Sequence, residues 1–151
     1  MRVGNAYFVP DDLVTETLVA AVRRGVAVEV LLPGAYQDST LVRGASRHRC
    51  GALLENGVRI FEYRPTMFHR KVMIIDDLWV SVGSANFDNR SFRLNDEANL
   101  NVYDAEFARH VSKIFEADLT RARRITFDAW KARPWQEKIL EHASALLSSQ
   151  L

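Results

Sequence analysis

The sequence has little cysteine, no long apolar run and almost no net charge. Cys50 is the only cysteine among 151 residues, which excludes an intrachain disulfide and makes a reducing compartment the default. No apolar stretch is long enough to cross a bilayer, and the first residues show no pattern of a secretion signal. The 20 basic and 19 acidic side chains leave a formal charge of +1, so no global field favours binding of nucleic acid.

The chain also lacks an internal repeat, a low-complexity tract and a recognisable linker. Its composition is 48% hydrophobic, which is enough for the core of one ordinary domain at this length. We therefore expect a single domain over residues 1–151.

The first part of the chain alternates strand and helix patterns. Strands are expected at 3–9, 26–32 and 58–63, with helices at 11–24 and 38–55 between them. Asp11 is the expected N-cap of the first helix, and either Asp38 or Ser39 caps the second, which Gly44 and Gly51 weaken. This order predicts a βαβ unit with parallel strands.

The second part adds three strands and two helical regions, expected at 72–75, 79–82, 97–103, 104–119 and from 127 onward. Asp77 marks a turn between the first two of these strands, and Asp104 is the expected cap of the long helix. Pro134 interrupts or restarts the final helix. The fold class is α/β, a mixed β-sheet flanked by helices.

Polar side chains gather around the strands at 72–75 and 79–82. Period-two alternation places His69 and Lys71 on one face at the start of the first strand. The loop from Gly83 and Ser84 to Asn86 follows the second strand and can return beside them. An imidazole, an ammonium, a hydroxyl and an amide are therefore expected in one pocket.

These residues form a known pattern. His69-x-Lys71-x4-Asp76-x6-Gly83-Ser84, with Asn86 and Glu97 beyond it, resembles the HKD signature of the phospholipase D superfamily. Further segments are similar to the carboxy-terminal half of a bacterial cardiolipin synthase: 7–11, 24–28, 32–34, 57–60, 86–95 and 133–134.

The resemblance implies phosphodiester exchange through a phosphohistidine, without a metal or another cofactor. Lys71, Ser84 and Asn86 are suited to hold the phosphate oxygens, where negative charge develops. Glu97 would accept a hydrogen bond from His69 and fix its tautomer. We assign supporting roles to Asp76, at the far end of its strand, and to Gly83.

The chain departs from the lipid-active members of this superfamily because it has one motif where they have two. The second histidine must come from a missing amino-terminal half or from another copy of the chain. Met1 stands just before the first strand, so we expect a carboxy-terminal piece of a longer enzyme. In the two-motif enzymes His69 would correspond to the general acid and base; in a homodimer it would also be the nucleophile.

Three functions follow from this interpretation. The first is one half of a phosphatidyltransferase that joins phosphatidylglycerol molecules, peripheral on the cytoplasmic side of the bacterial membrane. The second is a homodimeric phosphodiesterase or nuclease, although the near-zero charge makes nucleic acid an improbable partner. The third is an inactive fragment.

Other polar and aromatic residues favour structural roles. His48, His110 and His142 lie on expected helices without ligand-spaced partners, so we interpret them as surface or packing residues. Trp130 and Trp135 begin an apolar stripe that runs to Leu147. Such a stripe favours a helix packed on its own domain, with contact to a membrane surface as the alternative.

Overall fold

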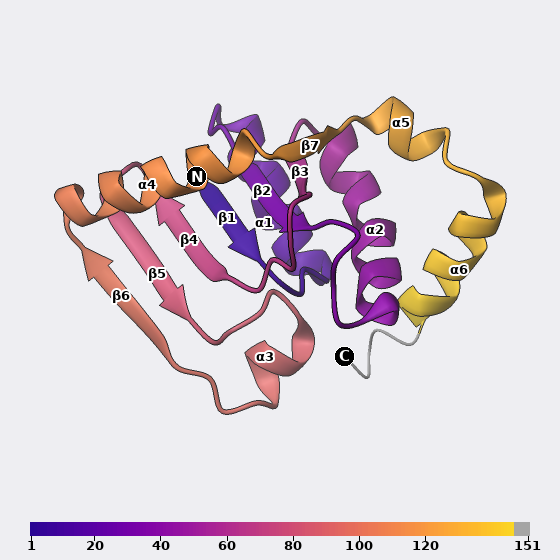
Figure 1. Cartoon of the computed structure of the whole chain (residues 1–151), viewed down its shortest axis with the longest axis horizontal. Coiled ribbons are helices and arrows are strands. Elements are labelled where there is room, and N and C mark those ends of the chain that lie inside the picture. Colours follow the sequence, from indigo (N-terminus) through magenta and orange to yellow (C-terminus); the bar gives the residue numbers. More distant parts are fainter. Residues whose placement is uncertain (147–151) are drawn as a thin grey trace.

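The computed structural model of the chain describes residues 1–146 and shows one sheet with helices on both faces (Figure 1). Within these residues, no helix is both long and apolar enough to span a bilayer. The elements in chain order are β1 (Arg2–Asn5), α1 (Asp12–Arg23), β2 (Glu29–Pro33), α2 (Thr40–Glu55), β3 (Arg59–Tyr63), β4 (Lys71–Ile75), β5 (Trp79–Gly83), α3 (Asn89–Arg93), β6 (Asn99–Tyr103), α4 (Ala105–Leu119), β7 (Ala122–Ile125), α5 (Phe127–Lys131) and α6 (Trp135–Leu146).

The sheet has the strand order β6-β5-β4-β1-β2-β3-β7, with β1 at its centre. β1 pairs in parallel with β2, and β2 in parallel with β3, which confirms the βαβ prediction. On its other side β1 pairs antiparallel with β4, and the chain continues antiparallel through β5 and β6. The predicted mixed α/β fold is confirmed.

Alternate residues of the central strands supply the two faces of the core. Val30 and Leu32 of β2 pack with the buried side chains of α1 and α2. Leu31 points to the other face, where it packs in the same cluster as Phe115 of α4. Because β2 is buried on both sides, its sequence is apolar at successive positions, as in other parallel strands covered by helices.

Three predicted helix caps are confirmed. The carboxylates of Asp11 and Asp104 accept hydrogen bonds from Val14 N at 2.8 Å and Phe107 N at 2.7 Å. For α2 the structure selects Ser39 from the two candidates, since its side chain accepts from Val42 N.

The first expected strand is too long. β1 ends at Asn5, whose Oδ1 accepts a hydrogen bond from Tyr7 N at 3.1 Å and so turns the chain. Phe8 instead forms an isolated bridge with Phe87. β2 and β6 begin later than expected, at Glu29 and Asn99, because these residues pair with the ends of their neighbouring strands.

Two short elements, α3 and β7, were not predicted from the sequence. α3 lies in the expected loop of residues 84–96, and Asp88 caps it by accepting from Ser91 N at 2.8 Å. β7 pairs antiparallel with β3, where Arg123 donates to the buried Glu62 at 2.6 Å. The arginines of β7 conceal its strand pattern, because apolar alternation is the main signal for a strand.

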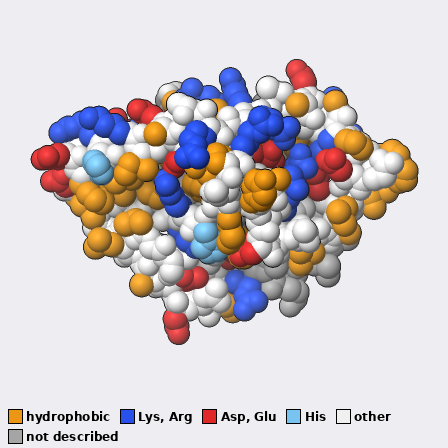
Figure 2. Space-filling model, in the orientation of Figure 1, with side chains coloured by type: hydrophobic (Ala, Val, Ile, Leu, Met, Phe, Trp, Pro, Cys, Tyr) orange, Lys and Arg blue, Asp and Glu red, His pale blue; other side chains and the backbone are white. Residues whose placement is uncertain are grey.

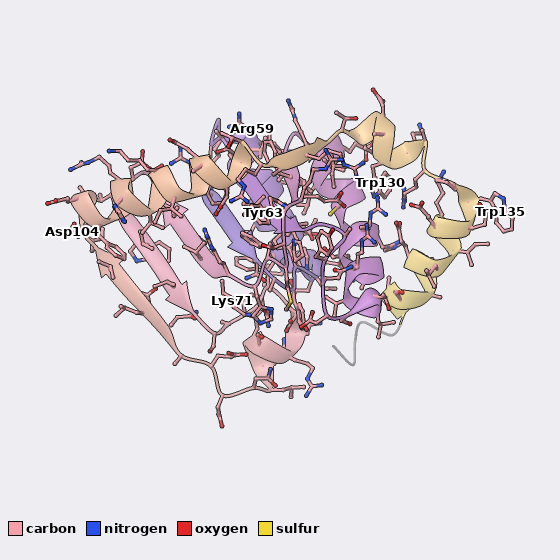
Figure 3. All side chains as sticks on the ribbon, viewed as in Figure 1. Arg59, Tyr63, Lys71, Asp104, Trp130 and Trp135 are labelled. Carbon is pink, nitrogen blue, oxygen red and sulfur yellow. The ribbon has the colours of Figure 1, made fainter. Side chains whose placement is uncertain are left out.

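The final helical region divides at Pro134 into α5 and α6, as predicted, and Leu147 falls outside the described residues. Trp130 of α5 points toward α2 and donates from Nε1 to the Arg47 carbonyl at 2.7 Å (Figure 3). A Cβ at Gly51 would collide with the Trp130 ring, and one at Gly44 would collide with Ser144 of α6. The two glycines that weaken α2 as a helix thus let α5 and α6 approach it.

A larger residue at Gly51 should release α5 from α2. In Gly51→Leu we expect faster trypsin cleavage at Lys131 and a net loss of about 1 kcal/mol, because overpacking costs about 1–3 kcal/mol and removal of a helical glycine returns up to about 1. Limited proteolysis and urea unfolding measure both effects. Ala52→Leu, at the exposed neighbouring position, is the control; equal behaviour of the two variants would contradict this packing.

Candidate active site

His69 and Lys71 line one pocket of about 390 Å³ at the beginning of β4. β4 begins at Lys71, so His69 lies just before the strand rather than inside it. Gly83 of β5 lines the same pocket, and Figure 3 shows Lys71 at the end of β4 that faces α3. Arg70 pairs with the buried Asp118 on α4. The structure therefore brings together the imidazole and ammonium that the motif predicts.

His69 is exposed and meets the edge of an aromatic ring. The rings of Tyr7 and His69 are 6.0 Å apart and cross at 85°. Tyr7 donates its hydroxyl hydrogen to Asp38 at 2.7 Å, and this bond, together with burial, raises the pKa of Tyr7 to about 12. Tyr7 is thus a protonated neighbour of His69 over the whole physiological range.

Lys71 lies among three carboxylates. Partial burial lowers its pKa, whereas the charges of Glu97, Asp38 and Asp88 act in the opposite direction. An ammonium in such surroundings is positioned to hold an anionic oxygen.

The loop from Gly83 to Asn86 is attached to the start of β6. Ser84 N donates to the Ala98 carbonyl at 3.0 Å, and Ala98 N donates to Ser84 Oγ at 3.0 Å. Ala85 N donates to Asn99 Oδ1 at 3.3 Å. A side chain at Gly83 would overlap the Ala98 carbonyl and the Asn99 amide, so only glycine permits this approach.

Asn86 lies in the part of this loop that contacts the end of β1. Its Oδ1 is buried and has no hydrogen-bond partner among the described residues. Buried polar atoms in proteins are normally satisfied, so an unpaired one calls for an explanation. This oxygen can only accept a hydrogen bond, so a phosphate oxygen would have to be held by the Nδ2 of the same amide.

Glu97 lies between the Ser84 loop and α3. Its Oε1 accepts from Ser91 Oγ at 2.9 Å and from Asn95 Nδ2 at 3.4 Å. Hydrogen bonding by Ser84 and then Ser91 lowers the pKa of this carboxyl, and the charge of Lys71 adds to the effect. Glu97 thus remains ionised at lower pH than an ordinary glutamate. Its hydrogen bond to His69 stays a prediction.

Asp76 lies at the opposite end of β4, about 17 Å from Lys71 for a strand of this length. It occupies a turn with Asp77, and both residues have positive φ, 54° and 49°. Asp77 accepts hydrogen bonds from Arg2 at 3.0 Å and Ser112 at 2.5 Å. This distance from Lys71 is too long for Asp76 to contact a phosphate bound at His69. It agrees with a supporting role for Asp76 at the turn.

Sequence reasoning overlooked Asn5, which joins two segments of the site. Asn5 is buried, and its Oδ1 accepts from Phe87 N at 3.3 Å as well as from Tyr7 N. Its Nδ2 donates to the Ala85 carbonyl at 3.5 Å. Asn5 therefore ties the Asn86 loop to the segment that carries Tyr7. The only signal for this role in the sequence was an asparagine at the end of a predicted strand.

Metal-ligand clusters and the single cysteine were also considered as possible reactive groups. Within residues 1–146 no three His, Cys, Asp or Glu side chains are arranged to share a metal ion. Cys50 is fully buried, which raises its pKa to about 12 and agrees with the predicted structural role.

The comparisons with known proteins agree with this geometry. A family model described as "Cardiolipin synthase, PLD-like domain" matches residues 1–119. The chain belongs to this phospholipase D-like family. It is 43% identical over 124 residues to cardiolipin synthase A of Pseudomonas putida (strain W619), which covers 82% of this chain but only 26% of that protein. The chain thus spans about a quarter of the length of this curated relative.

Solved structures share the fold. A phospholipase D family member, Nuc from Salmonella typhimurium, superposes with a TM-score of 0.73 at 22% identity, over 83% of this chain and 80% of that chain. Phosphatidylserine synthase of Haemophilus influenzae Rd KW20 gives 0.77 at 14% identity, over 99% of this chain and 41% of that chain. These TM-scores show that the fold is shared.

Removal of the Asn5 side-chain amide should break the hydrogen bonds that join the end of β1 to the loop at Ala85–Phe87. We expect Asn5→Ala to lose about 1–3 kcal/mol of unfolding free energy, because the part-buried backbone amides of Tyr7 and Phe87 are left without their partner. Chemical denaturation measures the loss. The exposed Asn101 of β6 provides the control Asn101→Ala, with an expected change within about 0.5 kcal/mol. A loss in the control as large as in Asn5→Ala would refute the assignment.

Proposed function

We propose that this chain is one catalytic half of a phosphatidyltransferase of the cardiolipin synthase type. The observation that carries the proposal is the pocket shared by His69 and Lys71 beside the Ser84–Asn86 loop, within a chain of this family. The substrate is a phosphatidylglycerol-like phospholipid, and the reaction exchanges one phosphodiester alcohol for another. We propose that it takes place at the cytoplasmic surface of a bacterial membrane.

The reaction uses two histidines in turn. One imidazole nitrogen attacks phosphorus and forms a P–N bond while the bond to the first alcohol breaks, and the second imidazole protonates that leaving alkoxide. The second histidine then removes the proton of the incoming hydroxyl, whose oxygen attacks phosphorus and releases the first imidazole. His69 supplies one of these two roles, and its exposure leaves it open to the opposing histidine.

Lys71, Ser84 and Asn86 hold the non-bridging phosphate oxygens during both steps. The ammonium and the polar groups offset the charge that accumulates at phosphorus without a metal ion. The carboxylate of Glu97, kept ionised by its serine neighbours, lies close enough to Lys71 to affect its pKa. We assign to Glu97 the orientation of His69.

An exposed apolar face beside the pocket is suited to receive the second half. It consists of Val82, Leu100, Phe107 and Ile114 on β5, β6 and α4. Figure 2 shows hydrophobic side chains gathered on this side of the molecule, below α4. Phe107 and Ile114 of α4 are 39% and 40% exposed. Large apolar patches next to a site mark association surfaces.

The histidine requirement can be tested in the longer protein that contains this chain, or with the chain supplied with its other half. We expect His69→Ala to reduce conversion of phosphatidylglycerol to cardiolipin at least about a hundredfold, since it removes the acid–base group. Mass spectrometry of the lipids measures the product. His110→Ala removes an exposed histidine from α4 and should change little. Cardiolipin formation that survives in His69→Ala would refute the proposal.

The exposed apolar face beside the pocket, which we call the association face, can also be tested. Ile114→Asp should abolish pairing with the other half or with a second copy, because it places a charge in the apolar interface. Analytical ultracentrifugation and co-purification measure the pairing. Leu13→Asp, at an exposed apolar residue of α1, is the control. If Ile114→Asp still pairs, the interface does not include this face.

The alternative is a homodimeric phosphodiesterase or nuclease. The observation in its favour is that this single-motif chain superposes on 80% of the Nuc chain, so no second half is needed to match that protein's size. A stable homodimer that nicks DNA, with activity lost in His69→Ala and no lipid exchange, would select this function. A monomer that neither exchanges lipid nor cleaves DNA would indicate an inactive fragment.

A further inference from the structure

A second cavity lies far from His69, in a groove between α5, α6 and α2. We call it the α5–α6 groove; it has a volume of about 630 Å³, and Lys131, Arg133 and Lys138 line it. In Figure 1, α6 lies at the opposite end of the molecule from β6 and the proposed association face. No residue of the catalytic pocket lines this groove.

The groove is positively charged. Lys131 and Lys138 have no acidic group within ion-pair distance among residues 1–146. Arg133 stacks on Trp130 at 3.8 Å, and both oxygens of the buried Glu141 face arginines, Arg133 at 2.7 Å and Arg47 at 3.8 Å. Glu137, next to Lys138 on α6, pairs with Arg47 at 3.2 Å, so Glu137 and Glu141 are both held by arginines.

Two histidines complete the polar lining. The rings of His48 and His142 are 5.2 Å apart, and both line the groove. Burial lowers the pKa of His48, the proximity of His142 and Arg49 lowers it further, and the charge of Glu141 acts in the opposite direction. The side chains of Lys131 and Lys138, which line the same groove, are therefore what makes it suited to an anion.

The rim of the groove is apolar. Trp135, Ile139 and Leu140 of α6 are 66%, 60% and 66% exposed. Trp135 projects from the outer end of α6 (Figure 3), in contrast to Trp130, which packs against α2. The opposite side of α6 is attached through the buried Glu141 and Ser144. α6 therefore presents a helix surface with apolar side chains beside a cationic groove.

This combination fits one kind of partner. Tryptophan and aliphatic side chains favour the interfacial region of a bilayer, and basic side chains beside them attract anionic lipid headgroups. A polyanion in water would match the lysines but would leave Trp135, Ile139 and Leu140 exposed. We propose that the α5–α6 groove binds the headgroup of an anionic phospholipid while α6 inserts its apolar residues into the membrane surface, independently of catalysis at His69.

The test uses the full chain and sucrose-loaded vesicles of phosphatidylcholine with or without phosphatidylserine, a lipid chosen because it is not the proposed substrate. We expect sedimentation only with the anionic vesicles. Lys131→Ser/Lys138→Ser should bind about thirtyfold more weakly, equivalent to about 2 kcal/mol for two basic groups at such a surface. Arg109→Ser/Lys113→Ser, which removes the same charge from α4, should bind within about threefold of the unchanged chain.

Insertion of α6 has its own readout. Phosphatidylcholine with brominated acyl chains, mixed with phosphatidylserine, should quench tryptophan emission, and Trp135→Phe should remove most of that quenching while the protein still sediments. His69→Ala should bind vesicles as the unchanged chain does, which separates this inference from the proposed function.

Four results would overturn the inference. They are no binding to anionic vesicles, equal weakening in both double variants, quenching that persists in Trp135→Phe, and a dimer through α6 that Ile139→Asp dissociates without any vesicle binding. Circular dichroism of each variant establishes that the chain is folded before binding is measured.

Discussion

The two ladders on either side of β1 hold the molecule together. On one side β1 continues the parallel βαβ unit with β2; on the other it pairs antiparallel with β4, the strand that begins with Lys71. Val3 of β1 is fully buried between the helical layers. Because both halves of the sheet meet at β1, the position of the site relative to the core depends on this short strand.

The end of β1 also organises the site. Asn5 turns the chain after the strand and binds the loop that carries Asn86, while Tyr7, two residues on, reaches His69. On the far side of that loop, Ser84 is hydrogen-bonded to Ala98 next to Glu97. Residues from four separate segments thus surround Lys71. Such preorganisation suits the proposed phosphodiester exchange, in which fixed dipoles would stabilise the developing charge.

Two surfaces at opposite ends of the sheet remain open, and they differ in chemistry. The face on β5, β6 and α4 is apolar and adjoins the His69 pocket. The α5–α6 groove combines lysines with an apolar rim and has no part in the pocket. In the two proposals above, the first surface receives a second catalytic half and the second binds a membrane.

Local sequence alone determined the helix caps at Asp11 and Asp104, the break at Pro134, the parallel βαβ unit and the residues of the HKD pattern, because each depends on neighbours along the chain. Only tertiary structure decided the end of β1 at Asn5, the pairing of the arginine-rich β7 with β3, and the packing of α5 and α6 against Gly51 and Gly44. It also separated the tryptophans, since Trp130 packs partly buried against α2 and Trp135 is exposed. These features depend on contacts between residues distant in sequence, whereas hydrophobic periodicity reports only the local pattern along the chain.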